Sequence, residues 1–175
     1  FVGARVGPAT TWLDLGCGVG EVLEAARTAG WSVRGVDGDA AEVAQARGRG
    51  FEVRHAWMTA ADLPALTPGA AVVSLLNVLD HVGEPASFLA GLAVGMDPGA
   101  WLAVEVPRHP SLSALCNGAF PDLAHRHLYP PHHLHVFSEC SLGLLLEVAG
   151  LVAEHVWTFG QDAAEMLDSL SLRAG

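Results

Sequence analysis

Short apolar segments alternate with segments of helical composition along most of this chain, and this alternation constrains the fold more than any other feature. The apolar run at residues 11–15 ends at Gly16, and a segment of helical composition follows at residues 21–29. Further strands are predicted at residues 31–37, 51–55, 71–76, 101–106 and 151–159. Further helices are predicted at residues 40–47, 85–96, 138–149 and 162–172. Elements in this order predict a doubly wound α/β fold with a mostly parallel sheet.

The length and the charge balance exclude several classes of protein. The chain has 175 residues, 51% of them hydrophobic, which is enough for one domain with a full core and argues against disorder. With 9 Lys and Arg against 19 Asp and Glu, the formal net charge is −10, so nucleic acids and anionic membranes are not expected partners. The longest uncharged stretch, residues 63–79, contains prolines and is too short to span a membrane.

The cysteines and the start of the chain bear on its location. Cys17, Cys116 and Cys140 are odd in number and far apart, which disfavours a disulfide framework and a zinc–cysteine site. No basic segment followed by an apolar run opens the chain, so a signal peptide is not expected. These observations predict a cytoplasmic protein. Because the chain begins at Phe1 and not at Met, we also expect its natural start to be missing.

A glycine-rich turn follows the first predicted strand and opens the first helix. Residues 14–20 read Asp-Leu-Gly-Cys-Gly-Val-Gly, and glycines here allow a sharp turn and close approach of a ligand to the backbone. The dinucleotide fingerprint GxGxxG would need its third glycine at the position of Glu21. That glutamate would place negative charge where a pyrophosphate must bind. The acidic residues Asp14 and Glu21 therefore favour a cationic or zwitterionic ligand, while Cys17 is expected to pack within the turn.

A second acidic residue completes the pattern. Asp37 ends the second predicted strand, about 20 residues beyond the glycine turn, and is followed by Gly38. A carboxylate at this place can accept hydrogen bonds from the two vicinal hydroxyls of a ribose. Together, the turn and the acid predict a site for a nucleoside without phosphates. S-adenosylmethionine, an adenosine that carries a sulfonium and an amino acid, fits this description.

Three segments resemble motifs of one known family. Residues 12–20 (WLDLGCGVG) resemble the first motif of class I S-adenosylmethionine-dependent methyltransferases, and residues 35–37 (GVD) resemble the family's ribose-binding acid. Residues 77–82 (NVLDHV) resemble its motif after the fourth strand, an acid–histidine pair before a helix. Order and spacing agree over residues 10–107. The resemblance implies a single Rossmann-like methyltransferase domain over residues 1–175, with S-adenosylmethionine as its cofactor.

The resemblance also implies a role for each part of the predicted crevice. The glycines of the turn would hold the methionine part of the cofactor, and Asp37 the ribose. Asp62 and Leu63 would lie near the adenine, while Asn77 and Leu79 would line the methionine or sulfonium region. The residues expected to bind the cofactor are Asp14, Gly16, Cys17, Gly18, Gly20, Asp37, Gly38, Asp62, Leu63, Asn77 and Leu79.

Two histidines are candidates for the chemistry of methyl transfer. His81 follows the fourth strand at the mouth of the expected site, where it could act as the general base or position the acceptor. The alternative is a helix-start histidine bound to the backbone. Residues 108–137 form a long insertion, typical of a lid or an acceptor pocket. His133 lies in a stretch resembling the H-L-x-x-F-S segment of a bacterial methyltransferase subfamily associated with sugars, surface polysaccharides and secondary metabolites, and it is the second catalytic candidate.

The insertion is rich in histidine, which raises the question of a metal site. His125 and His127, and likewise His133 and His135, have spacing compatible with imidazole ligation on a strand. We favour the interpretation that these are polar residues of a lid that form hydrogen bonds. No metal ion is therefore expected.

The sequence favours transfer of a methyl group from S-adenosylmethionine to an oxygen or carbon of a small molecule: a sugar, a polysaccharide precursor or a secondary metabolite. The alternative is a catalytically silent binding domain that retains the methyltransferase fold. A nicotinamide dehydrogenase is disfavoured by Glu21. Neither the seventh strand usual in the family nor its N-terminal covering helix is found, so we expect a truncated chain, and a homodimer is left open.

Overall fold

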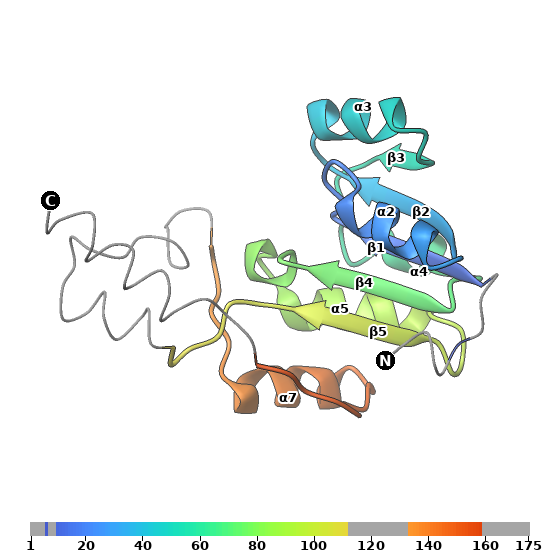
Figure 1. Cartoon of the computed structure of the whole chain (residues 1–175). Helices are drawn as coiled ribbons and strands as arrows, with labels where there is room; N and C mark the ends of the chain where they lie inside the picture. Colours follow the sequence, from blue (N-terminus) through green and yellow to red (C-terminus); the bar gives the residue numbers. More distant parts are fainter. Residues whose placement is uncertain (1–5, 7–9, 112–132, 159–175) are drawn as a thin grey trace, which may run out of the picture.

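The computed structural model describes residue 6, residues 10–111 and residues 133–158, and these form one parallel sheet covered by helices (Figure 1). The strands are β1 (Thr11–Leu15), β2 (Ser32–Asp37), β3 (Val53–His55), β4 (Val72–Leu76) and β5 (Trp101–Glu105). The helices are α2 (Glu21–Thr28), α3 (Ala40–Gly48), α4 (Leu63–Leu66), the 3-10 helix η1 (Leu79–His81), α5 (Pro85–Gly95) and α7 (Glu139–Val148). The predicted α/β fold is thus confirmed.

The strand order β3-β2-β1-β4-β5 places the point of reversal between β1 and β4. The chain runs outward through β2 and β3 on one side of β1, and then crosses to β4 and β5 on the other. Every pairing is parallel, so the carboxyl ends of all strands lie at the same edge of the sheet. In open α/β sheets, this edge at the reversal point is where ligands bind.

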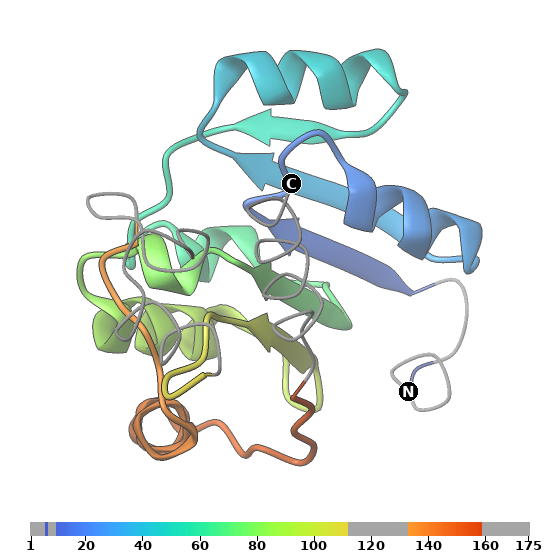
Figure 2. The ribbon, with the colours of Figure 1, turned by 60° about the vertical axis from the view of Figure 1, so that its left-hand side comes forward.

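Alternation along the strands divides the core into two faces. Leu13 and Leu15 of β1 face the main core, which also holds buried residues of α4 and α5 and partly buried residues of α7. The opposite face carries α2 and α3 around Leu23 and Val43. Figures 1 and 2 agree in placing α7 at the β5 side of the molecule, away from α3. Because helices cover both faces of the sheet, β4 is buried on both sides, and its residues are apolar except for Ser74.

Two short helices, α4 and η1, form outside the predicted elements. In α4, Leu63 and Leu66 are buried in the main core, and a proline stands near the helix start, where its missing N–H costs nothing. The 3-10 helix η1 follows β4 directly and buries Leu79. Burial of these leucines favours one helical turn in each segment.

The predicted sixth strand is wrong for the part the structure describes. Residues 151–158 contain neither strand nor helix, and all but Leu151 are exposed, including Val152, Val156 and Trp157. A strand forms only where a neighbouring strand pairs with its backbone hydrogen-bonding groups, and no described strand pairs with these residues. The predicted helix at residues 162–172 lies outside the described residues.

The two ends of the predicted insertion are joined to each other. Arg108 and Phe137 form a parallel bridge, in which the N–H of His109 donates to the carbonyl of Phe137 at 2.8 Å. Directly after it, Ser138 caps α7, and its side chain accepts a hydrogen bond from the N–H of Ser141. The insertion therefore leaves and re-enters the domain at one place, beside the end of β5. Residues 112–132, with His125 and His127, lie outside the described residues. Among the described helices, none has the length and apolarity to cross a membrane.

Candidate functional site

The glycine turn between β1 and α2 forms the first wall of the site. Gly16, Gly18 and Gly20 have φ of 77°, 52° and 87°, a region that other residues rarely adopt. The N–H groups of Gly16 and Cys17 both donate to the carbonyl of Val36, at 2.8 and 3.2 Å. A Cβ at Gly16 would collide with the side chain of Val78, which lies against the turn. The first glycine is therefore required by both its backbone angle and its surroundings.

Asp37 holds the glycine turn to the start of α3. Its Oδ2 accepts a hydrogen bond from the N–H of Gly18 at 2.8 Å, and its Oδ1 accepts one from the N–H of Asp39 at 2.7 Å. Asp37 is buried, so these bonds compensate part of its lost hydration. A carboxylate oxygen can accept more than one hydrogen bond, which leaves capacity for a ligand. Its contact with a ribose stays a prediction.

Asp14 lies beneath the turn in a buried polar chain. The hydroxyl of Ser74 donates to Oδ1 of Asp14 at 2.5 Å, and the indole N–H of Trp12 donates to the same hydroxyl at 2.8 Å. Burial raises the pKa of Asp14 to about 6; the bond from Ser74 opposes this shift, and the negative charge of Asp37 adds to it. Asp14 thus titrates close to neutral pH.

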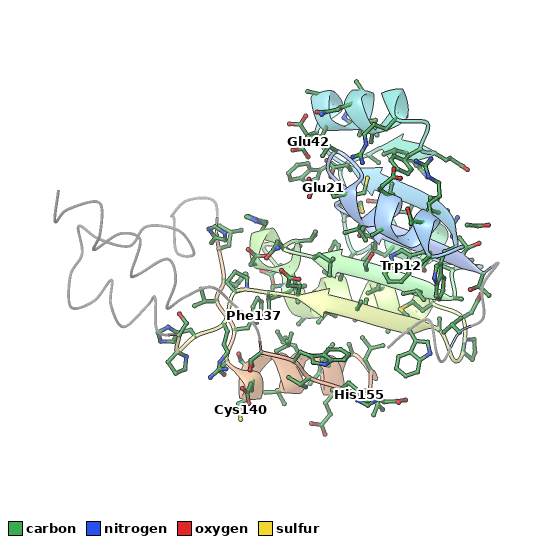
Figure 3. All side chains as sticks on the ribbon, viewed as in Figure 1. Trp12, Glu21, Glu42, Phe137, Cys140 and His155 are labelled. Atoms are coloured by element: carbon green, nitrogen blue, oxygen red, sulfur yellow. The ribbon has the colours of Figure 1, made fainter. Side chains whose placement is uncertain are left out.

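The surroundings of the turn carry negative charge. Glu42 of α3 lies beside Gly18, and desolvation together with Asp37 raises its pKa. Figure 3 shows Glu21 and Glu42 at one edge of the molecule, from α2 and α3 respectively. Cys17 is buried, and burial raises the pKa of its thiol to about 12, so it is a neutral packing residue.

The edge expected to lie near the adenine has a feature that sequence reasoning missed. Trp57, which follows β3, lies over Gly38, where a Cβ would come within 2.6 Å of the indole ring. Its side chain is 82% exposed, although it is a large aromatic ring. The sequence did offer one signal for this residue: it lies two residues after β3, at the carboxyl edge where ligands bind. An exposed, flat indole beside the turn can stack on a base.

The residues predicted near the adenine, Asp62 and Leu63, and near the methionine or sulfonium, Asn77 and Leu79, differ in their access to a ligand. Asp62 is exposed and accepts hydrogen bonds from the N–H and hydroxyl of Thr59, which lower its pKa. Leu63 is fully buried in the main core, so only its backbone can meet a ligand. The same is true of Leu79. Asn77 is exposed, has φ of 53°, and donates from Nδ2 to Glu105 at 3.1 Å.

The two predicted catalytic histidines meet on a carboxylate that the sequence did not single out. Nε2 of His81 lies 3.3 Å from Oδ2 of Asp80, and Nε2 of His133 lies 3.6 Å from the same oxygen. The two imidazole centroids are 4.9 Å apart. Asp80 had been noted only as the acid of the acid–histidine motif. Asp80 has no exposed surface, so its carboxylate meets the two imidazoles and not the solvent.

Backbone hydrogen bonds hold the cluster together. The carbonyl of Asp80 accepts from the N–H of Leu134 at 2.8 Å and of His135 at 3.1 Å. The end of the insertion is thereby fixed on η1, which carries His81. Phe137, labelled in Figure 3 near the end of β5, continues this segment into the core. The cluster of Asp80, His81 and His133 is called the imidazole–carboxylate cluster below.

Comparisons with known proteins agree with this geometry. The ubiquinone biosynthesis O-methyltransferase of Thiobacillus denitrificans is 36% identical over 95 residues, covering 51% of this chain and 41% of that protein. The chain thus spans less than half the length of that curated relative. The structure resembles magnesium protoporphyrin IX methyltransferase from Synechocystis PCC 6803 with bound SAH (TM-score 0.68, 20% identity, covering 92% and 73% of the two chains).

A similar fold occurs in a protein named for another reaction. The [4+2]-cyclase SpnF matches with a TM-score of 0.67 and 22% identity, covering 98% of this chain and 65% of that one. The family described as "Methyltransferase domain" matches residues 3–156, which is most of the chain. The chain therefore belongs to this family of methyltransferase domains.

Proposed function

We propose that the protein transfers a methyl group from S-adenosylmethionine to an oxygen of a small molecule, such as a sugar, a polysaccharide precursor or a secondary metabolite. The observation that carries the proposal is the meeting of His81 and His133 on buried Asp80, directly after β4. The name of the Thiobacillus relative, an O-methyltransferase, supports oxygen as the acceptor atom. The resemblance around His133 supports the acceptor class.

The residues present fit this cofactor. The glycine turn presents backbone that no Cβ shields, and Asp37 keeps unused acceptor capacity beside it. Asp14, Asp37 and Glu42 surround the turn with carboxylates, which suit a positively charged ligand and oppose a pyrophosphate. The exposed ring of Trp57 suits an adenine. When bound, S-adenosylmethionine supplies a methyl group already activated by a positively charged sulfur.

The imidazole–carboxylate cluster would complete the reaction. The acceptor oxygen forms its bond to the methyl carbon as the carbon–sulfur bond breaks, and that bond's electron pair stays on sulfur. The proton of the acceptor hydroxyl passes to His81, which is partly exposed, or His81 positions that hydroxyl. Asp80 stabilises the imidazolium that results. Alignment of the two reacting atoms supplies the rest of the rate enhancement.

The test separates cofactor binding from turnover. S-adenosylhomocysteine should raise the melting temperature, since a ligand at 100 times its Kd adds about 2.7 kcal/mol of stability. His81→Ala should keep this shift and lose turnover with a panel of hydroxylated acceptors, about 100-fold or more. His155→Ala is the matched control, because His155 is an exposed histidine that does not belong to the cluster; Figure 3 shows it beside α7. Full turnover by His81→Ala would remove the proposed role of this histidine, and methyl incorporation at carbon would correct the acceptor atom.

The second candidate function is a catalytically silent methyltransferase-like domain. The likeness to a protein named as a cyclase favours keeping it, because this fold is compatible with other chemistry. Binding of S-adenosylhomocysteine without methyl transfer to any acceptor would support this candidate.

We also propose a cytoplasmic location and leave a homodimer as a prediction. Cys17 and Cys140 are both free thiols, which agrees with a reducing compartment. Light scattering coupled to size-exclusion chromatography checks the oligomeric state, and fractionation of the source cells checks the location.

A further inference from the structure

We propose that Asp80, His81 and His133 bind one divalent transition-metal ion of the Zn²⁺ or Co²⁺ kind, which holds the acceptor oxygen. This replaces the sequence-based expectation that no metal is bound. The role of the ion in catalysis rests on the proposed function, but its binding does not.

The donor set is the first argument. Two imidazoles and one carboxylate are a common protein ligand set for zinc and for non-haem iron, and they leave at least one coordination position open. Among the described residues, these three are the group whose donor atoms gather within 4.8 Å of one another. Asp80 and His81 are neighbours in the chain, whereas His133 arrives from the far end of the insertion.

The distances are the second argument. Ligands at about 2.0–2.2 Å from a tetrahedral ion lie about 3.3–3.6 Å from one another. Oδ2 of Asp80 is 3.3 Å from Nε2 of His81 and 3.6 Å from Nε2 of His133. Both histidines present Nε2 to the same oxygen, and one donor atom from each of the three residues lies within 4.8 Å of the others.

The lack of hydrogen bonds to the buried carboxylate of Asp80 is the third argument. Its carboxylate has no exposed surface, and neither of its oxygens accepts a hydrogen bond from the described residues. The two imidazoles are close to it, but not in hydrogen-bond geometry. A buried, unpaired carboxylate is costly, and a bound cation compensates that cost. The side chain of His81 is 42% exposed, which gives the ion a path from solvent.

The backbone prepares the site before an ion arrives. The hydrogen bonds from Leu134 and His135 to the carbonyl of Asp80 fix the segment that carries His133. The ligands are thus held near their final positions by main-chain contacts and not by the ion alone. Such preorganisation reduces the conformational cost of binding.

Binding of the ion would leave His81 with one of its two proposed roles, positioning the acceptor hydroxyl, and would exclude the role of general base. Once His81 and His133 are ligands, they position the acceptor through the ion, and neither imidazole takes its proton. An acceptor hydroxyl in the open coordination position loses its proton to solvent more readily, because the ion stabilises the oxygen anion. That oxygen then attacks the methyl carbon, as described above.

The experiment measures metal directly on the full chain, purified without a histidine tag and stripped with a chelator. Titration with Zn²⁺ by calorimetry should give one equivalent, and Co²⁺ should give the visible absorption bands of a tetrahedral site. His133→Ala and Asp80→Asn should each weaken Zn²⁺ binding by about 100-fold or more. His155→Ala should leave it unchanged. Circular dichroism identifies any variant that fails to fold. His81→Ala is a third variant of the site, at a position that is only partly buried.

The outcomes separate this inference from the proposed function. Unchanged Zn²⁺ affinity in folded His133→Ala would overturn the site, because another part of the chain would then hold the ion. Absence of Zn²⁺ binding by the parent protein would overturn it as well. The shift in melting temperature with S-adenosylhomocysteine, measured on metal-free protein, tests the cofactor site alone. Zn²⁺ binding without the melting shift would support the metal site alone, and the melting shift without Zn²⁺ binding would support the cofactor site alone.

Discussion

Replacement of buried Asp14 by asparagine should make the variant increasingly more stable than the parent protein as the pH rises. Burial raises the pKa of Asp14 from 3.8 to about 6, so the folded state holds this proton more tightly than the unfolded chain does. Stability is therefore lost as the pH rises from the unfolded pKa through the folded pKa, and the loss is complete above about pH 7. Asp14→Asn keeps an oxygen that accepts from Ser74, but it carries no charge.

The magnitude follows from the shift. A rise from 3.8 to about 6 corresponds to about 3 kcal/mol in total. About 1.4 kcal/mol of this falls between about pH 5 and pH 8, because the unfolded carboxyl is already ionised at the lower limit. The melting temperature of Asp14→Asn relative to the parent protein should therefore rise by about 4 °C over that interval.

The assay is a set of thermal melts of both proteins across this pH interval. Other titrating groups are common to both, so the difference between them isolates Asp14. Asp62→Asn is the control: hydrogen bonds from Thr59 lower the pKa of exposed Asp62, so its difference from the parent should stay flat above about pH 5. A difference between Asp14→Asn and the parent that does not change with pH would refute the reasoning.

Three further predictions concern the site. Gly16→Ala should lower stability by at least about 1 kcal/mol and abolish the melting shift with S-adenosylhomocysteine, because the φ of Gly16 is 77°. Gly48→Ala in α3 is the control: a Cβ there meets open space, so this variant should be neutral or stabilising in the same melts. Trp57→Ala should weaken binding of S-adenosylhomocysteine by about tenfold in calorimetry with little change in stability, since the ring is 82% exposed; equal weakening by Trp157→Ala would contradict a stacking role. In single-turnover kinetics, His81→Ala should slow methyl transfer without weakening cofactor binding; a loss confined to cofactor affinity would count against the acceptor role.

Local signals were sufficient to predict most of the sheet. The first five predicted strands correspond to β1–β5, and their boundaries agree within one or two residues. The glycine turn was predicted because its residue types impose the backbone angles that the structure shows at Gly16, Gly18 and Gly20. These features depend on neighbours in the sequence, and a single chain carries that information.

Features that depend on distant contacts could not be predicted in this way. Residues 151–158 were predicted as part of a strand, but a strand also needs a partner, which sequence pattern does not supply. Leu63 and Leu79 match motif positions near a cofactor, and yet both side chains are fully buried in the main core. The pairing of His81 with His133 depends on backbone bonds to the carbonyl of Asp80, across more than 50 residues of chain.

The residues after β4 connect the two halves of the site. Val78 packs on Gly16 of the glycine turn, and the next residues provide Asp80 and His81 of the imidazole–carboxylate cluster. Within four residues, one segment therefore contacts the turn proposed to hold the cofactor and carries the histidine proposed to face the acceptor. Burial of Leu79 between them anchors this segment in the core. Because a misplacement of about 1 Å between reacting groups can slow a reaction about 100-fold, a rigid segment here would preserve the proposed reaction geometry. A change at Val78 should accordingly alter turnover more than it alters the affinity for either ligand alone.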